Sequence, residues 1–315
     1  MSTIAERRSG AGGRLSARAP APSDETPAVD SGVEISRGRA LWRTIRRKPL
    51  GAASATLIAV LVLTAIFADV LAPYDPLDAD PTIRLSRPSA AHPFGTDDIG
   101  RDVLSRVIYG SRISLWVGLL AVGIGTAAGM IIGLACGYWE GRLDILLQRV
   151  MDAIQAIPGL VLALAIVAIL KPSTTNAMLA IAVVIIPGNS RIVRGAVLSA
   201  KQNRYVEAAE AIGCRQPRIL LSHILPNVTA PILVIASIWL GNAILIEATL
   251  SFLGVGTQPP TPSWGLMLSS TGRAFMEQAP WLAIFPGLAI SLAVLAFNLF
   301  GDTLRDAWDP KLRKS

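Results

Sequence analysis

The side chains that could carry out catalysis or hold a metal are few in this sequence and far apart. The only histidines are His92 and His223, and the only cysteines are Cys136 and Cys214. Neither pair has the spacing of a zinc site, a disulfide framework or a nucleophile with its general base. A phosphate-binding loop needs a Gly-Lys pair, and the sequence contains none. We therefore expect no enzyme activity, no metal site and no ATP site in this chain.

Three polar residues inside long apolar runs remain as candidates: Asp152, Gln155 and Glu247. An ionisable residue inside a membrane span is a functional candidate by default. Glu247 lies about 20 residues beyond Pro226, which at ~1.5 Å per residue places it near the outer interface. We favour a structural or gating role for Glu247 over substrate binding. Asp152 and Gln155 lie nearer the inner end of their span, where they either bond neighbouring helices or line a path.

Membrane-spanning helices would position these residues. Of the 315 residues, 52% are hydrophobic and 16% are charged, whereas a soluble domain carries about 25% charged residues. The apolar runs are near the ~20 residues that cross a bilayer. The sequence thus predicts an all-α polytopic membrane protein with six transmembrane helices at 50–71, 113–138, 145–170, 177–197, 228–255 and 281–300. Pro158 is expected to kink the third span, and Pro187-Gly188 to break the fourth.

The second span is rich in glycine at spacings that let helix backbones approach closely.

The whole chain is expected to divide into five parts. A disordered cytoplasmic N-terminal tail (1–40) is followed by a basic collar with the first span (41–72) and by an outer connection (73–112). A five-helix core (113–303), which includes a cytoplasmic loop (199–227), precedes a cytoplasmic C-terminal tail (304–315). The N-terminal tail has too few large apolar side chains to fold and lacks the apolar core of a signal peptide.

The outer connection is expected to contain an amphipathic surface helix at 98–109. This helix could be a gate or a docking surface, or it could only seal the ends of the spans. The candidate gate or docking residues are Asp97, Arg101, Asp102 and, in the outer loop at 256–279, Trp264.

The basic residues predict the orientation of the spans. Seven of the 29 Lys and Arg residues fall on one side, and the other 22 fall on the side that holds both termini and the loop at 199–227. Because cytoplasmic segments carry the excess of Lys and Arg, both termini should be cytoplasmic. This clustering beside apolar runs also argues against nucleic-acid binding as the reason for the net charge of +7.

Residues 205–227 form a polar segment between two spans. The Ala-rich start favours a helix, and Gly213 supplies a left-handed stop. Pro217 suits the first turn of a second short helix, which we expect to end at Pro226-Asn227. A helix, a sharp bend and a second helix between two spans predict a docking element.

This segment resembles the EAA loop of importer permeases of the ATP-binding-cassette class, through Glu207-Ala208-Ala209, then Gly213, then His223-Ile224-Leu225-Pro226. The general pattern has Ile at the position of His223, whereas the dipeptide and oligopeptide branch has His-Ile-Leu-Pro-Asn there. Segments 92–106, 110–115, 247–254, 259–265 and 297–302 are also similar to the C-type permease subunit of that branch. The resemblance covers about 41–313.

The resemblance implies a type I importer permease fold in the plasma (inner) membrane and the import of short peptides. It implies as partners a second, B-type permease subunit, two ATPase subunits that bind ATP and Mg²⁺, and an extracytoplasmic solute-binding protein, with no cofactor in this chain. The residues that would couple it to an ATPase are Glu207, Ala208, Ala209, Gly213, His223, Leu225 and Pro226.

Other substrates and other classes of protein remain as alternatives. Similar permeases import nickel chelates, glutathione or oligosaccharides, and the binding protein usually selects the substrate. A secondary transporter would need charged groups at mid-membrane, of which the spans have few. A membrane enzyme would need a catalytic constellation that the sequence lacks.

Overall fold

The computed structural model describes residues 49–269 and 274–308. The expected disordered tail at 1–40 and the collar residues before 49 lie outside the described residues. Within the described ranges the chain is helical, and the only extended pairing is one bridge between Thr96 and Asp102. The all-α prediction is confirmed.

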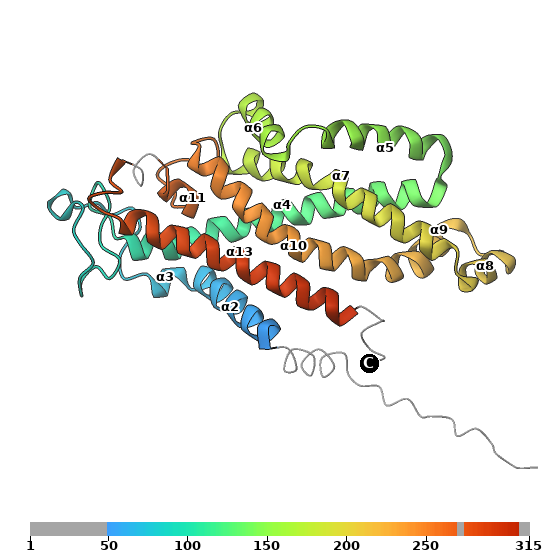
Figure 1. Cartoon of the computed structure of the whole chain (residues 1–315), viewed down its shortest axis with the longest axis horizontal. Helices are drawn as coiled ribbons and strands as arrows, with labels where there is room; N and C mark the ends of the chain where they lie inside the picture. The colour runs from blue at the N-terminus through green and yellow to red at the C-terminus, as the bar shows by residue number, and fades with distance from the viewer. Residues whose placement is uncertain (1–48, 270–273, 309–315) are drawn as a thin grey trace, which may run out of the picture.

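The long helices run side by side in one bundle (Figure 1). The elements in order are α2 (Pro49–Ile66), α3 (Ala68–Leu71), the 3-10 helix η1 (Pro81–Ile83), α4 (Val103–Trp139), α5 (Gly141–Gln155), α6 (Gly159–Leu170), α7 (Thr174–Lys201), α8 (Arg204–Ala211), α9 (Gln216–Arg218), the π-helix η2 (Ile219–Ile224), α10 (Leu225–Phe252), α11 (Trp264–Met267) and α13 (Trp281–Trp308). We call the end of the bundle with α3 and α11 the loop end, and the opposite end with α8 the α8 end (Figure 1).

Five helices of the described residues are long and apolar enough to cross a membrane, and the bent pair α5–α6 makes a sixth span if counted as one. This agrees with the six predicted spans. The third one is not a kinked single helix, because α5 and α6 meet at 90°. Pro158 occupies the position just before α6, and its missing N–H and fixed φ explain why the break falls there.

The expected surface helix at 98–109 is not a separate element. α4 begins at Val103 and continues without a break through the whole second span. Asp102 starts it, because its side chain accepts a hydrogen bond from the Ser105 N–H at 2.7 Å. No residue between the two expected helices forces an end, so they merge into one helix of 37 residues.

Four glycines of α4, Gly125, Gly129, Gly133 and Gly137, lie against α7. Their spacing predicted a close approach of two helix backbones, although not which helix would be the partner. A Cβ atom on Gly125 would lie 2.7 Å from the Ala182 carbonyl oxygen, and one on Gly133 would lie 2.5 Å from that of Ser190. The two backbones therefore approach as closely as small residues allow. Apolar side chains of α7 and α10, including Ile181, fill the core beside this contact.

Three further boundaries differ from expectation. α7 continues through Pro187 rather than breaking there. The helix predicted to end at Pro226-Asn227 instead runs on through η2 into α10. Pro226 follows the wider π-helical turn of η2. α13 extends to Trp308, so the expected tail at 304–315 begins as helix.

Candidate functional site

The segment at the α8 end forms the bend that the sequence predicted. α8 ends where Gly213 takes a φ of +76°, and the Cys214 N–H donates to the Ala209 carbonyl at 3.0 Å. Pro217 lies in the first turn of α9. The chain thus reverses within a few residues and enters α10 through η2.

The inner face of α8 is held by apolar burial. Val206 and Ala209 are 2% and 4% exposed, and they share a cluster with Ile219, Ile224 and Val228. Since this cluster joins α7, α8, η2 and α10, α8 moves with the ends of two spans rather than as a loose loop. Glu207 and Ala208 point the other way and are exposed.

His223 and Leu225 are half-buried and Pro226 is exposed, all beyond the bend. The carbonyl of His223 accepts a hydrogen bond from the Asn227 side chain at 2.6 Å. The structure therefore brings the seven predicted coupling residues to the same end of the bundle. A large apolar side chain, Ile212, is 80% exposed beside them.

A ladder of three ion pairs connects α5 and the residue before it to α7. Arg191 Nη2 lies 2.7 Å from Asp152 Oδ1, Arg194 Nη2 lies 2.6 Å from Asp144 Oδ2, and Lys201 Nζ lies 2.6 Å from Glu140 Oε1. Arg194 Nε also donates to Asp144 at 2.7 Å. Asp152 is thus bound to a neighbouring helix, which was one of its two expected roles.

Gln155 lies exposed at the end of α5, next to the break. It lines a hollow with Ile157, Pro158, Gly188 and Trp239. No side chain of the described residues caps the N-terminus of α6 that faces this break. Gln155 is therefore on the surface of the bundle, beside backbone groups that lack helical partners.

Glu247 is 1% exposed and fully bonded. Ser251 Oγ donates to Oε1 at 2.7 Å, Ser114 Oγ donates to Oε2 at 3.1 Å, and Thr257 Oγ1 donates to Oε1 at 3.3 Å. The carboxyl group thereby joins α10, α4 and the loop after α10. The group lies near the loop end, and its bonding partners are hydroxyl groups of this chain.

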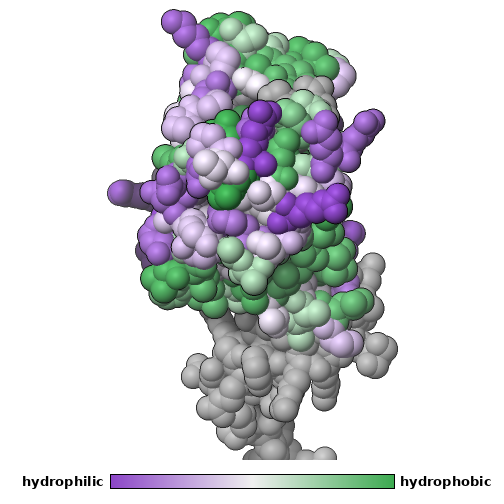
Figure 2. Space-filling model, turned by 90° about the vertical axis from the view of Figure 1, so that its left-hand side faces the viewer, coloured by the Kyte–Doolittle hydropathy of each residue, from purple (hydrophilic) through white to green (hydrophobic). Residues whose placement is uncertain are grey.

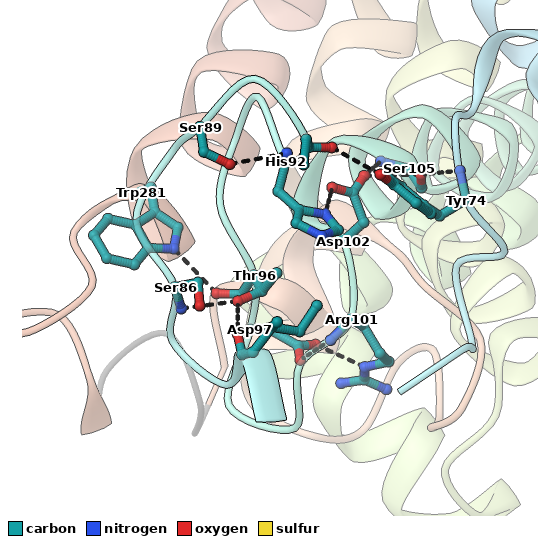
Figure 3. A network of polar contacts seen from close by, with 12 residues as sticks. Tyr74, Ser86, Ser89, His92, Thr96, Asp97, Arg101, Asp102, Ser105 and Trp281 are labelled. Carbon is teal, nitrogen blue, oxygen red and sulfur yellow. Dashed lines mark hydrogen bonds and ion pairs between the residues drawn. The ribbon is translucent and has the colours of Figure 1, made fainter. Parts of the chain in front are cut away.

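The loop end is tied together by a polar network (Figure 3). Asp97 accepts from Arg101 Nε at 2.6 Å, and Asp102 accepts from the Ser105 hydroxyl at 2.8 Å. His92 Nδ1 lies 2.9 Å from the other oxygen of Asp102. Asp97 and Asp102 are 4% and 2% exposed, so most of each side chain is turned into the loop end.

Trp264 is likewise buried, at 1% exposure, and its Nε1–H donates to the Val107 carbonyl at 2.9 Å. Gly110 makes room for this ring, because a Cβ there would lie 3.0 Å from the indole. Three of the four predicted gate or docking residues therefore build the loop end from within. Figure 2 shows the surface of this end, where hydrophilic side chains gather.

The first span is fastened at the same end. Asp69 of α3 accepts from Tyr109 Oη at 2.8 Å and from Arg112 Nη2 at 3.1 Å. These two bonds fasten α3 to the first turns of α4.

Sequence reasoning missed the ion-pair ladder and the His92–Asp102 contact. A signal for the ladder was present, since segment 140–155 alternates charged and apolar residues at helical spacing. Only residues 145–155 of this segment were assigned to the third span, and their charges were given no ion-pair partners. The partner of each charge lies 39 to 61 residues away, which no local pattern reveals.

Residues 129–314 match the family described as "binding-protein-dependent transport system inner membrane component". Residues 36–88 match the "N-terminal TM domain of oligopeptide transport permease C".

Two relatives and one solved structure are similar to the chain. A dipeptide transport system permease protein of Alkalihalophilus pseudofirmus is 44% identical over 93% of this chain and 96% of its own. A glutathione transport system permease protein of Escherichia coli is 46% identical over 86% of this chain and 90% of its own. A structure of the MetNI methionine ABC transporter in inward-facing conformations shares the fold, with a TM-score of 0.50 and 18% identity over 65% of this chain and 98% of its own.

Proposed function

Because this chain belongs to the family of binding-protein-dependent transport system inner membrane components, we propose that it forms half of a path that carries dipeptides or short oligopeptides inward. It is a multi-pass inner-membrane protein and a permease subunit of an ATP-binding-cassette importer. The similarity to a dipeptide permease extends over 93% of the chain, which supports the choice of peptide as the substrate.

The path needs a second half, an energy source and a delivery protein. We assign these to a second, homologous permease of the B-type, two ATPase subunits that bind ATP and Mg²⁺, and an extracytoplasmic solute-binding protein. This chain has no Gly-Lys pair, so the hydrolysis of ATP falls to the partners. By the count of basic residues, the α8 end and both termini lie in the cytoplasm.

The observation that carries this proposal is the α8 element. Its buried face joins it to α7 and α10, while Tyr205, Ala208 and Ile212 are exposed at i, i+3 and i+7 along one side. That spacing places the three side chains on one face. We assign this face to the contact with an ATPase subunit, whose closure would then push the ends of two spans as one body.

The other predicted residues receive roles that follow from their surroundings. Asp97, Asp102 and Trp264 keep the loop end rigid. Arg101 is the most exposed of the four residues, so we assign to it the role of contacting a docked protein. Glu247 fastens α10 to α4 near the same end. Gln155 and the Asp152–Arg191 pair face the passage.

The test is ATP hydrolysis by the assembled importer in proteoliposomes, with its binding protein loaded by different ligands. We expect stimulation by a dipeptide. Because a relative of similar identity is a glutathione permease, glutathione is the second candidate, and a nickel chelate is the third. Stimulation by either of these and by no dipeptide would overturn the substrate, and uptake that persists without ATPase subunits would overturn the importer assignment.

A further inference from the structure

The loop end of the bundle contains a cavity of about 120 Å³. Charged side chains of the outer connection and the first turn of α4 form one wall, and apolar side chains of α11 and of the start of α13 form the other. These residues are Asp97, Arg101 and Arg106 on the charged wall, and Leu266, Met267 and Leu282 on the apolar wall. Since the two walls come from distant parts of the sequence, only the folded chain forms this cavity.

Arg106 brings a buried positive charge with few partners to the charged wall. The residue is 5% exposed. Its Nη1 donates to the Pro76 carbonyl oxygen at 3.0 Å, whereas its Nε lies 3.6 Å from Asp97 Oδ2, beyond the length of a hydrogen bond. A guanidinium group has five N–H donors, so most of those on Arg106 have no acceptor within the described part of the chain. A buried charge of this kind gains from any acceptor that enters the cavity.

Asp97 does not satisfy Arg106, because its oxygens are already engaged. Oδ1 accepts from the backbone N–H groups of Ile99 and Arg101 at 3.0 and 2.9 Å, and Oδ2 accepts from Arg101 Nε at 2.6 Å (Figure 3). Among the described residues, Arg101 uses only this Nε of its guanidinium group as a side-chain donor.

The charged wall therefore carries an excess of positive charge. Two guanidinium groups and one carboxylate line the cavity, which leaves one positive charge in excess. Asp98 follows Asp97 in the sequence but does not line the cavity. Both Arg101 and Arg106 have unused N–H groups, so the chemistry of this wall favours a small anion.

The shape of the cavity selects a carboxylate among small anions. The planar fork of a guanidinium group matches the two oxygens of a carboxylate. The opposite wall of Leu266, Met267 and Leu282 offers apolar contact to a short aliphatic stem, which inorganic phosphate lacks. A cavity of about 150 Å³ encloses a benzene molecule, so this smaller one holds a group of about six non-hydrogen atoms or fewer.

We propose that this cavity binds a carboxylate on a short aliphatic stem, and that the C-terminal carboxylate of a short peptide is its source. The carboxylate site stands on the geometry of the cavity, whereas the choice of a peptide as the source rests on the proposed function. By the count of basic residues, the loop end faces outward, so an arriving peptide meets this cavity before the spans. Arg101 then has a role besides the contact with a docked protein.

The site makes two demands on a peptide. A free C-terminal carboxylate is required, because an amide at that position carries no charge and places N–H donors against the donors of Arg101 and Arg106. The last side chain must be small, since it shares the cavity with the carboxylate. In bound alanyl-alanine, the methyl group of the C-terminal residue would lie against the apolar wall, and that of the first residue would lie outside.

The test is saturation-transfer NMR on the assembled importer in nanodiscs, without its binding protein and without ATP. The probes are propionate, alanyl-alanine and alanyl-alaninamide, and empty nanodiscs give the background. We expect a severalfold larger signal from the C-terminal than from the first methyl group of alanyl-alanine, competition by propionate, and a signal near background from the amide. Equal signals from the dipeptide and its amide would overturn the proposal.

Two variants of the full chain place the binding at this cavity. Leu266→Trp fills the cavity and keeps its charges, and Arg101→Gln removes one guanidinium group and keeps the volume nearly unchanged. Each should lower the signal severalfold in an importer that still assembles. Met276→Trp is the matched control, because Met276 is 50% exposed at the same end and does not line the cavity. An unchanged signal in both cavity variants would show that the carboxylate binds elsewhere, and the inference would be wrong.

Further arms separate the source of the carboxylate from the site. Acetyl-glutamyl amide carries its only carboxylate on the side chain, so its binding in place of alanyl-alanine would replace the peptide terminus by an acidic side chain. Full competition by inorganic phosphate would overturn the choice of a carboxylate. If propionate binds at the cavity while no dipeptide stimulates ATP hydrolysis by the complete importer, the site stands and the proposed substrate fails. If dipeptides stimulate hydrolysis but nothing binds at the cavity, the proposed function stands and this inference fails.

Discussion

Arg194 of α7 holds the carboxylate of Asp144 on α5 with two nitrogens, Nε at 2.7 Å and Nη2 at 2.6 Å. The Asp144 side chain is 10% exposed and that of Arg194 is 33% exposed. A two-pronged bond of this kind fixes direction as well as distance. The bond joins α5 and α7 into one unit. Between these two helices the chain bends by 90° into α6, reaches the loop end and returns in α7.

Replacing Asp144 by Asn should lower the stability of the protein by about 1.5–3 kcal/mol, because it leaves a partly buried guanidinium with a neutral acceptor. The Tm of the detergent-purified chain would fall by several degrees. Arg149→Gln is the matched control, since Arg149 lies 3.9 Å from its acidic partner and is 79% exposed. A double-mutant cycle with Arg194→Gln measures the coupling; a coupling energy near zero would show that the bond contributes nothing.

Ala208→Trp should uncouple peptide import from ATP hydrolysis while the complex still assembles. Ala208 is exposed on α8, so a large side chain there alters the proposed ATPase contact without a packing cost. Ala209, its neighbour, is 4% exposed, and Ala209→Trp should instead prevent folding or assembly by overpacking the core. The measurement is peptide imported per ATP hydrolysed in proteoliposomes. A normal ratio for Ala208→Trp would remove the α8 face from the coupling contact.

The local features of this fold were readable from the sequence, and the long-range ones were not. Gly213 and Pro217 act through their own backbone geometry, so their turn and helix start could be predicted. The extent of α4 could not, because its start depends on Asp102, whose side chain both caps the helix and meets His92. The Ser114–Glu247 bond spans 133 residues of sequence and exists only through packing.

The same reason explains why the burial of residues at the loop end was not predicted. The sequence offered Asp97, Asp102 and Trp264 as candidates for a gate or a docking surface, and no local pattern showed which way their side chains turn. In the structure they turn inward, where backbone groups and hydroxyls satisfy them. Polar residues with partners within a few residues, such as Asp97 and Arg101, are the local sign of such a folded loop.

Glu247→Ala should destabilise the loop end by about 1–3 kcal/mol, because the hydroxyls of Ser114, Ser251 and Thr257 would lose a buried acceptor. Glu247→Gln keeps an oxygen acceptor and nearly the same volume, so its effect should be smaller. The comparison is the Tm of the two variants. If transport is lost in Glu247→Gln while its Tm is unchanged, the ionisable group has a role in transport that goes beyond holding α10 to α4.

Asp102→Ala should loosen the outer connection, because it removes the cap of α4, at about 1 kcal/mol, together with the contact to His92. Hydrogen exchange of the backbone at 86–105 should then become faster. Asp80→Ala is the control, since Asp80 caps the short η1 in an exposed position. Faster exchange in both variants alike would mean that the connection is not held through Asp102.

Gly133→Leu should be among the most damaging single substitutions in the bundle. A Cβ on Gly133 would lie 2.5 Å from the Ser190 carbonyl oxygen and 2.6 Å from Val193 Cβ, so α4 and α7 would have to separate. Gly123 lies in the same helix, and a Cβ there meets nothing within 4 Å, so Gly123→Leu changes hydrophobicity and size without the clash. Both variants gain helix propensity over glycine, by about 1 kcal/mol, which leaves the contact with α7 as the difference between them. We expect Gly133→Leu to yield little folded protein by size-exclusion chromatography and Gly123→Leu to behave as the unmodified chain. Equal yields would show that the two helices can separate at little cost, and that the close approach of α4 and α7 does not hold the bundle together.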